Sequence, residues 1–228
     1  MNTQTEVLGG SSIALPAERQ RVLRNTYALL AVSMIPTVLG AWVGVATGIT
    51  SLMSPMIGLV VFLAGAFGFM FAIQKYRNSG LGVALLLGFT FFMGLMLARL
   101  LGMVLSMGNG TSLVMMAFAG TSAAFFGMAV LSSVVKRDLS GLAKFLFIGA
   151  IGILVVGIAN VFIQSGALMM TLSVLAVLVF SAFILVDLKR VRDGEETNYV
   201  TATLGVYLSL YNVFQSLLAM FGIMGGED

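Results

Sequence analysis

The sequence contains no cysteine, no histidine and few charged residues. Without cysteine, no disulfide or thiolate metal site can form, and the redox compartment of the protein cannot be inferred. Without histidine, the chain lacks the commonest metal ligand and the usual pH-sensitive side chain, so proton sensing would depend on carboxylates. No Ser–His or Cys–His pair can be built and no HExxH motif is present, which argues against an intramembrane enzyme.

Charged residues make up only 9% of the 228 residues, whereas hydrophobic residues make up 59%. A typical soluble domain has about 25% charged residues, so this chain has too little charge to cover a water-soluble fold. A helix needs about 20 apolar residues to cross a bilayer, and the chain has seven such runs. We therefore predict an all-α integral membrane protein, a seven-helix transmembrane bundle over residues 26–224. The predicted spans are 26–48, 53–74, 81–106, 112–135, 142–163, 167–187 and 202–224.

The basic residues are sorted to alternate connections between these spans. Of the 12 Lys and Arg residues, all but Arg99 lie in or beside the N-terminal tail and the second, fourth and sixth connections. The connections near 49–52, 107–111 and 164–166 have none, and neither has the tail 225–228. Because basic loops stay in the cytoplasm, we predict a cytoplasmic polar tail over residues 1–25 and a short periplasmic tail over 225–228. This charge sets topology, so no nucleic-acid partner is expected.

Two charged residues fall inside predicted spans, and such residues are functional candidates. Asp187 lies 20 residues after Ala167, about 30 Å along the sixth span, which puts it at the cytoplasmic mouth. It is either an interfacial carboxylate, solvated or paired with Lys189 or Arg190, or a titratable gate. Arg99 lies towards the other end of the third span, and we expect its side chain to reach the outer interface.

The seventh span is the most polar of the seven. Ser209, Asn212 and Ser216 share one helical face, and a polar face in a membrane helix is expected to point into the bundle. Because the sixth span descends to the cytoplasm and the seventh rises from it, Asp187 and Ser209 should lie at similar depth. The further candidates for this interior are Tyr207 and Tyr211 in the same span and Asn160 in the fifth.

The segment GEETNYVTATLGVYLSLYNVFQSLLAMFG (194–222) resembles the C-terminal part of the Bax-inhibitor family, in particular its bacterial YccA-like branch. VLRNTYALLAVS (22–33), KRDLSGLAKFLFIG (136–149) and FSAFILVDLKRV (180–191) add to the resemblance, which runs from about residue 19 to the end. It implies a bundle in which the polar last helix is central and is surrounded by the other six.

The resemblance implies two different functions. Some family members are pH-sensitive calcium leak channels gated by two aspartates; Asp187 matches the first, but the second position falls on Ser209. YccA-like proteins are instead linked to the membrane protease FtsH, as substrates and modulators, and the tail 1–25 would then be the segment within its reach, or else a disordered leader.

We therefore expect a non-enzymatic inner-membrane protein that modulates an FtsH-type protease. The alternative is a leak for Ca²⁺ or H⁺ with Asp187 as the gate. No cofactor is expected, and the only candidate metal contact is a weak one at Asp187. The expected partners are the lipid bilayer and the protease complex.

Overall fold

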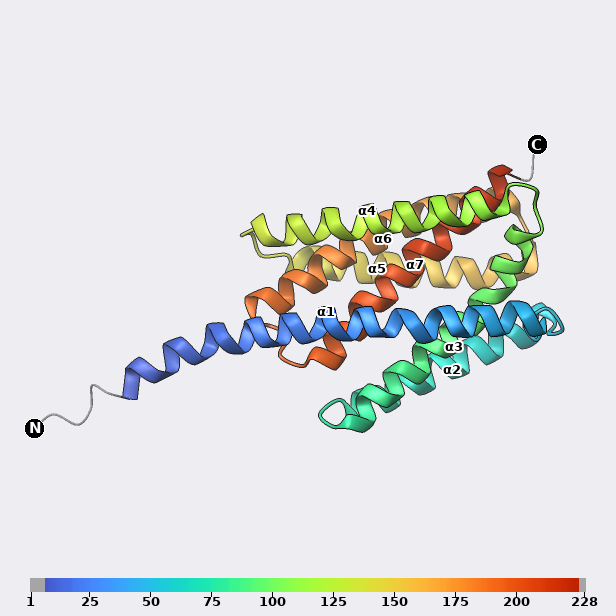
Figure 1. Cartoon of the computed structure of the whole chain (residues 1–228). Coiled ribbons are helices and arrows are strands. Elements are labelled where there is room, and N and C mark those ends of the chain that lie inside the picture. Colours follow the sequence, from blue (N-terminus) through green and yellow to red (C-terminus); the bar gives the residue numbers. More distant parts are fainter. Residues whose placement is uncertain (1–6, 226–228) are drawn as a thin grey trace, which may run out of the picture.

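A computed structural model describes residues 7–225, with side chains from residue 17 onwards (Figure 1). Within these residues the chain forms seven helices and no strand, which confirms the predicted fold class. All seven helices are long and apolar enough to cross a membrane. They are α1 (Val7–Thr47), α2 (Pro55–Tyr76), α3 (Gly80–Leu105), α4 (Gly110–Val134), α5 (Ser140–Ile163), α6 (Gly166–Asp193) and α7 (Tyr199–Gly225).

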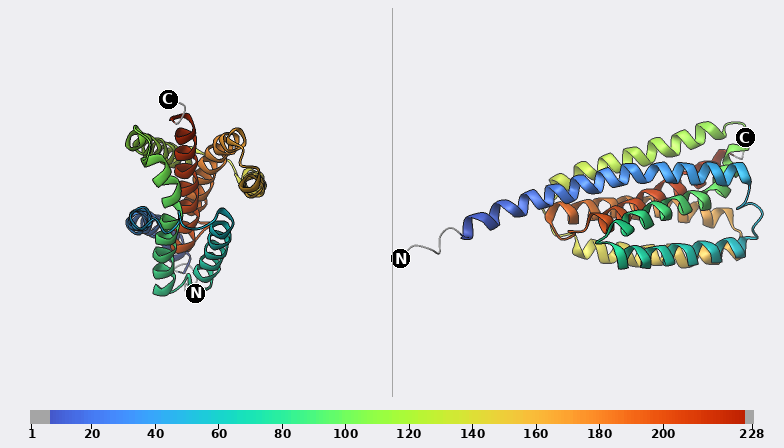
Figure 2. Two further views of the ribbon diagram at one scale, coloured as in Figure 1. Left: turned by 90° about the vertical axis from the view of Figure 1, so that its right-hand side faces the viewer. Right: turned by 60° about the horizontal axis from the view of Figure 1, so that its bottom comes forward.

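Consecutive helices run in opposite directions, so the connections alternate between the two ends of the bundle (Figures 1 and 2). The start of α1 and the end of α7 lie at opposite ends. The start of α1 shares its end with the α2–α3, α4–α5 and α6–α7 connections. We call this the basic end, because every Lys and Arg except Arg99 lies in or beside these segments. The basic end is predicted to face the cytoplasm.

The first helix starts earlier than predicted. α1 begins at Val7 rather than near residue 26, and it projects beyond the other helices at the basic end (Figure 1). Residues 17–24 read AERQRVLR and are mostly strong helix formers, and extending an existing helix needs no new nucleus. The predicted tail over 1–25 is therefore helical from Val7 onwards, and residues 1–6 lie outside the described part of the chain.

The sixth helix also exceeds its predicted length, because α6 continues past Asp187 to Asp193. An ion pair between Lys189 and Asp193, one helical turn apart, supports this extra turn. Gly194 then ends the helix with a φ of 83°, a left-handed conformation that favours glycine. The last helix, α7, ends at Gly225. Residues 226–228 of the predicted periplasmic tail lie outside the described residues.

The last helix is the centre of the bundle. Fourteen of the 27 residues of α7 are buried, and α7 packs against α1, α2, α3, α4 and α6. The predicted ring of six helices is wrong in one member, because α5 packs on α6 and α2 and does not contact α7. Only Leu146 is buried among the 24 residues of α5. α5 is therefore a peripheral helix whose apolar side chains are available to lipid.

Helices α1 and α3 approach each other closely enough to require glycine. A Cβ atom added at Gly94 would collide with the carbonyl oxygen of Thr37, and one added at Gly40 would collide with that of Phe91. Without a hydrophobic drive between helices in lipid, such close packing is a main source of association. The contact fixes the position of Thr37, which bonds to α7.

Candidate functional site

The α7 helix presents two polar faces to different neighbours. Gly205 and Ser209 are one turn apart and face α6, where they meet Asp187. Tyr207 and Tyr211 are also one turn apart, and their hydroxyl groups reach α1 and α3. The predicted interior is therefore not a single polar face, because residues two apart on a helix point about 200° from one another.

Asp187 lies against α7 at the basic end of the bundle. A Cβ atom added at Gly205 would lie 3.2 Å from its Oδ2 atom, and the Ser209 hydroxyl is its polar neighbour on α7. Asp187 and Ser209 therefore lie at a similar level of the bundle, as predicted. A small pocket of about 120 Å³ opens beside the carboxylate, and Glu196 and Arg190 also line it. Asp187 is half-buried at this mouth.

Tyr207 and Tyr211 connect α7 to its neighbours instead of lining an opening. The Tyr207 hydroxyl lies 2.9 Å from Thr37 Oγ1 on α1 and donates to the Thr90 carbonyl oxygen on α3 at 3.4 Å. The Tyr211 hydroxyl donates to the Met93 carbonyl oxygen at 3.2 Å. Only 1% of Tyr207 and 6% of Tyr211 is exposed. These two predicted pore candidates therefore act as interhelical anchors in this structure.

The other polar residues of α7 do not join Asp187. The Asn212 side-chain amide donates to the Leu208 carbonyl oxygen of its own helix at 2.8 Å. Ser216 is buried two turns beyond Ser209, away from the basic end. A polar group in lipid needs a partner, and Asn212 finds one inside α7. The candidate site is therefore limited to Asp187, Ser209 and the mouth beside them.

The structure places Asn160 and Arg99 away from this site. Asn160 was predicted to face the interior, but it lies at the end of α5, where its amide bonds to the backbone of Ser165 in the α5–α6 turn. That turn contains Gln164 in a left-handed conformation, with φ 54°, and Asn160 satisfies its backbone groups. Arg99 is exposed and donates to the Met53 carbonyl oxygen in the α1–α2 connection at 3.5 Å, as expected for a side chain reaching the outer interface.

Sequence reasoning missed several polar groups that organise the basic end. Asn198 caps α7 by accepting hydrogen bonds from the backbone of Val200 and Thr201. Its amide also donates to the Arg77 carbonyl oxygen at 3.1 Å, which ties the α6–α7 connection to the α2–α3 connection. The Asn-x-x-Thr spacing before an apolar run is a helix-start signal that would have found the cap, but nothing local indicates the second contact.

A second missed group is Arg192, near the end of α6. Its guanidinium bonds to Asp193 and donates to the carbonyl oxygens of Ser132 and Val135 at the end of α4. Arginine suits this role because its planar fork carries several donors. The last carbonyl groups of α4 are thereby satisfied by a side chain, and α4 and α6 are joined at the basic end.

The residues that the structure describes contain no cluster of three or more acidic, histidine or cysteine side chains close enough to hold a metal ion. Asp187 has one other carboxylate beside it at this mouth, that of Glu196 in the α6–α7 connection. Hard cations such as Ca²⁺ prefer six to eight oxygen ligands. The mouth offers two carboxylates and an adjacent guanidinium, which is a weak arrangement for a divalent cation.

Comparison with known proteins identifies relatives along nearly the whole chain. A family model described as "Inhibitor of apoptosis-promoting Bax1" matches residues 19–226. A protein of Escherichia coli K12 named "Modulator of FtsH protease YccA" is 37% identical over 202 residues, covering 89% of this chain and 90% of that protein. An uncharacterised membrane protein of Vibrio cholerae is 36% identical over 218 residues, and the alignment covers 96% of both chains. An uncharacterised protein of Pseudomonas aeruginosa is 37% identical with the same coverage.

Proposed function

The chain belongs to the Bax inhibitor family, and from this premise we propose that it is a non-enzymatic modulator of an FtsH-type protease in the bacterial inner membrane. The observation that carries the proposal is the end-to-end similarity to the Escherichia coli protein named a modulator of FtsH protease. The alignment with an Escherichia coli protein named "Inner membrane protein YccA" covers 90% of that protein, and all seven helices of this chain are long and apolar enough to cross a membrane. The geometry at Asp187 favours this function over ion conduction.

The site at Asp187 lacks the acid pair that a two-aspartate gate needs. Two carboxylates in contact share protons, because two negative charges at short range repel each other. Here the side chain facing Asp187 from α7 is the Ser209 hydroxyl, which carries no charge and does not titrate. The pair of acids from α6 and α7 is therefore absent, and the second carboxylate of the mouth, Glu196, comes from the α6–α7 connection.

The N-terminal part of α1 supplies a surface for a protease complex. α1 has 41 residues, about 60 Å of helix, whereas the 27 residues of α7 span about 40 Å. The excess projects from the basic end, which is predicted to face the cytoplasm (Figure 1). Arg19 packs against Gly194, where its Nε would lie 2.5 Å from an added Cβ atom. This contact braces the projecting helix against the α6–α7 connection.

Reconstitution with an FtsH-type protease and a membrane substrate of that protease tests this function. We expect the full chain to co-purify with the protease at native expression and to change the rate of substrate degradation. A variant lacking residues 2–16 keeps all seven spans and should lose both effects, whereas a variant with residues 2–16 in scrambled order tests whether sequence or length matters. Clean separation from the protease, with unchanged substrate turnover in cells lacking the protein, would contradict the proposal.

The second candidate is a cation leak with Asp187 as its titrating group, and the pocket beside this carboxylate favours it. Calcium and proton flux into proteoliposomes across about pH 6–8 tests it. We expect a leak to disappear or lose its pH dependence in Asp187→Asn, whereas Asp138→Asn, which removes a carboxylate at the same end that does not line this pocket, serves as the matched control. Flux that is unchanged in Asp187→Asn would exclude this gate, and an impermeable wild type would exclude the channel.

A further inference from the structure

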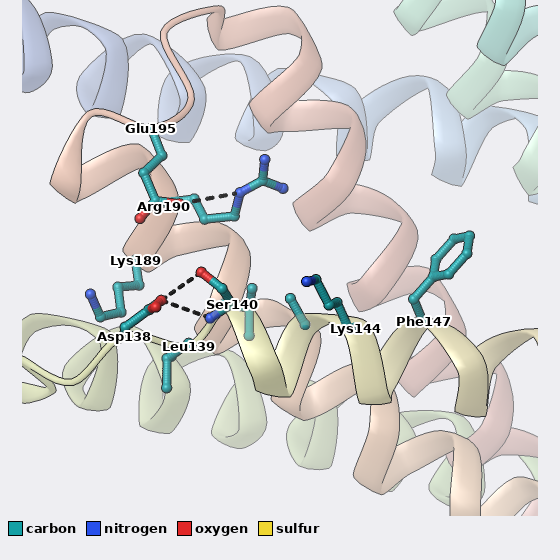
Figure 3. Close-up of a pocket in the computed structure, with 10 residues that line it drawn as sticks. Asp138, Leu139, Ser140, Lys144, Phe147, Lys189, Arg190 and Glu195 are labelled. Carbon is teal, nitrogen blue, oxygen red and sulfur yellow. Dashed lines mark hydrogen bonds and ion pairs between the residues drawn. The ribbon is translucent and has the colours of Figure 1, made fainter.

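A larger pocket lies at the basic end, between the first two turns of α5 and the last two turns of α6 (Figure 3). Its volume is about 370 Å³. It is separate from the mouth beside Asp187, although Arg190 contributes to both. The side chains that give it its character are Lys144, Lys189, Arg190, Phe147, Asp138 and Glu195.

The three basic side chains of this pocket differ in whether they already form an ion pair. Lys189 is only 6% exposed and is paired with Asp193, so its charge is held in place. Lys144 is exposed and has no ion pair among the described residues. The Arg190 Nε lies 3.7 Å from Glu195 Oε2, and both side chains are about half exposed. An exposed pair of that kind contributes little, so Lys144 and Arg190 can accept a stronger anion.

Asp138, an acidic side chain at the rim, is already engaged at the start of α5. Asp138 Oδ1 accepts hydrogen bonds from the Ser140 backbone N–H at 2.8 Å and from the Ser140 hydroxyl at 2.6 Å. These bonds, assisted by the charges of Lys189 and Lys144, hold the pKa of Asp138 below its ordinary value of 3.8. The carboxylate therefore caps the first turn of α5, and this role holds its Oδ1 atom at Ser140 (Figure 3).

The pocket continues into an apolar face that is open to lipid. Phe147 lines it and is 61% exposed. Ile151 and Leu154 follow at one and two turns along α5, and both are exposed. Lys144 lies about 6 Å along α5 from Ser140, near the start of this membrane-spanning helix. The cationic part thus faces the membrane surface and the apolar part follows the hydrocarbon.

We propose that this pocket binds the phosphate headgroup of an anionic phospholipid of the cytoplasmic leaflet. Lys144 and Arg190 contact the phosphate oxygens, and one acyl chain lies along Phe147, Ile151 and Leu154. Arginine binds phosphate through two parallel N–H bonds, and lysine binds it as a point charge. Basic pockets between helices on the cytoplasmic side suit such headgroups. The inference requires the predicted orientation and is independent of the protease function.

Native mass spectrometry of the full chain in mild detergent tests the proposal. The probes are dioleoyl-phosphatidylglycerol, dioleoyl-phosphatidylcholine and inorganic phosphate. Each basic residue near an anionic surface strengthens binding about fivefold, so Lys144→Gln/Arg190→Gln should bind phosphatidylglycerol about thirtyfold more weakly. Lys136→Gln/Arg137→Gln removes the same charge from exposed residues of the α4–α5 connection that do not line the pocket. This control should bind like the wild type.

Three results would overturn the proposal. Equal weakening in both double variants would mean that net charge, not the pocket, attracts the lipid. Retention of phosphatidylcholine equal to that of phosphatidylglycerol would mean that the pocket does not distinguish lipids by the charge of the headgroup. Full competition by millimolar inorganic phosphate, with no lipid retained, would identify a site for soluble phosphate. Should the double variant fail to fold, Lys144→Gln alone removes an unpaired, exposed charge and should show the fivefold loss.

Discussion

Replacing Gly94 by alanine should separate the two helices that position α7. The added Cβ atom would overlap the Thr37 carbonyl oxygen and lie 2.9 Å from the Ala41 nitrogen. All of these are main-chain atoms, so no side-chain rotation can make room. Overpacking of this kind costs about 1–3 kcal/mol. Moving α1 away also weakens the bond between Thr37 and Tyr207, worth about 0.6 kcal/mol in a membrane protein.

Gly102→Ala is the matched control, because Gly102 lies on the same helix and an added Cβ atom would meet nothing within 4 Å. Alanine is favoured over glycine inside a helix by about 0.5–1 kcal/mol, so this control should be neutral or stabilising. That gain applies to both variants and cancels, so their free energies of unfolding should differ by the overpacking and the weakened bond, about 1.5–3.5 kcal/mol.

Unfolding in mixed micelles with increasing mole fraction of dodecyl sulfate measures this difference. Because Trp42, the only tryptophan of the chain, is 67% exposed, the loss of helix is followed by circular dichroism rather than by its fluorescence. Equal unfolding midpoints for Gly94→Ala and Gly102→Ala would refute the reasoning, because they would show that the helices can yield at no cost.

Three further predictions follow from contacts elsewhere in the bundle. Asn198→Ala removes the cap of α7 and should lower the free energy of unfolding by about 1–2 kcal/mol. Asn198→Asp keeps the accepting oxygen, so its melting temperature should lie between those of the wild type and Asn198→Ala. An Asn198→Ala protein that melts like the wild type would contradict this. Tyr207→Phe should lower the free energy of unfolding by about 0.6 kcal/mol, and by at most about 1.7 kcal/mol. A double-mutant cycle with Thr37→Ala should give a coupling energy of similar size, and a coupling energy of zero would contradict this. The folded pKa of Asp138 is lowered, mainly by the Ser140 hydroxyl. The ionised Asp138 carboxylate therefore stabilises the fold fully above its unfolded pKa of 3.8. This stabilisation is lost as the pH falls through the lower pKa of the folded state. Melting between about pH 7 and 3 should show a larger acid loss in the wild type than in Asp138→Asn, in which the other acids still titrate; identical curves would exclude this role.

The spans and the sorting of basic residues were predictable because both depend on local composition. A run of apolar residues has one stable place in a bilayer, and each basic connection then lies at the end opposite to its neutral neighbours. The proximity of Asp187 and Ser209 was also predictable. It needs only the direction of two consecutive helices and the rise per residue, without knowledge of how each helix is rotated.

Contacts that depend on helix rotation were not predictable. Thr37 and Tyr207 are 170 positions apart, and no sequence pattern says which face of α1 turns towards α7. Asn160 shows the same limit: a polar residue near the end of a span satisfies lipid equally well by facing the interior or by closing a turn. The peripheral place of α5 was equally hidden, because lipid-facing and protein-facing surfaces are both apolar in a membrane.

The two candidate functions require opposite behaviour from α7. Ions that pass Asp187 and Ser209 must continue along α7 beyond the level of Tyr207 and Tyr211, which are buried against α1 and α3. Asp187 and Ser209 lie at the opposite face of α7 from these tyrosines, so a leak that opens by moving α7 as a whole would have to break its contacts with both helices. Hydrogen bonds of about 0.6 kcal/mol each would not prevent that movement, but Tyr207 also packs edge-on against Phe89, which is fully buried. A modulator that acts through the projecting part of α1 leaves this packing intact. A tightly anchored α7 is thus a cost for the proposed channel and no obstacle to the proposed modulator.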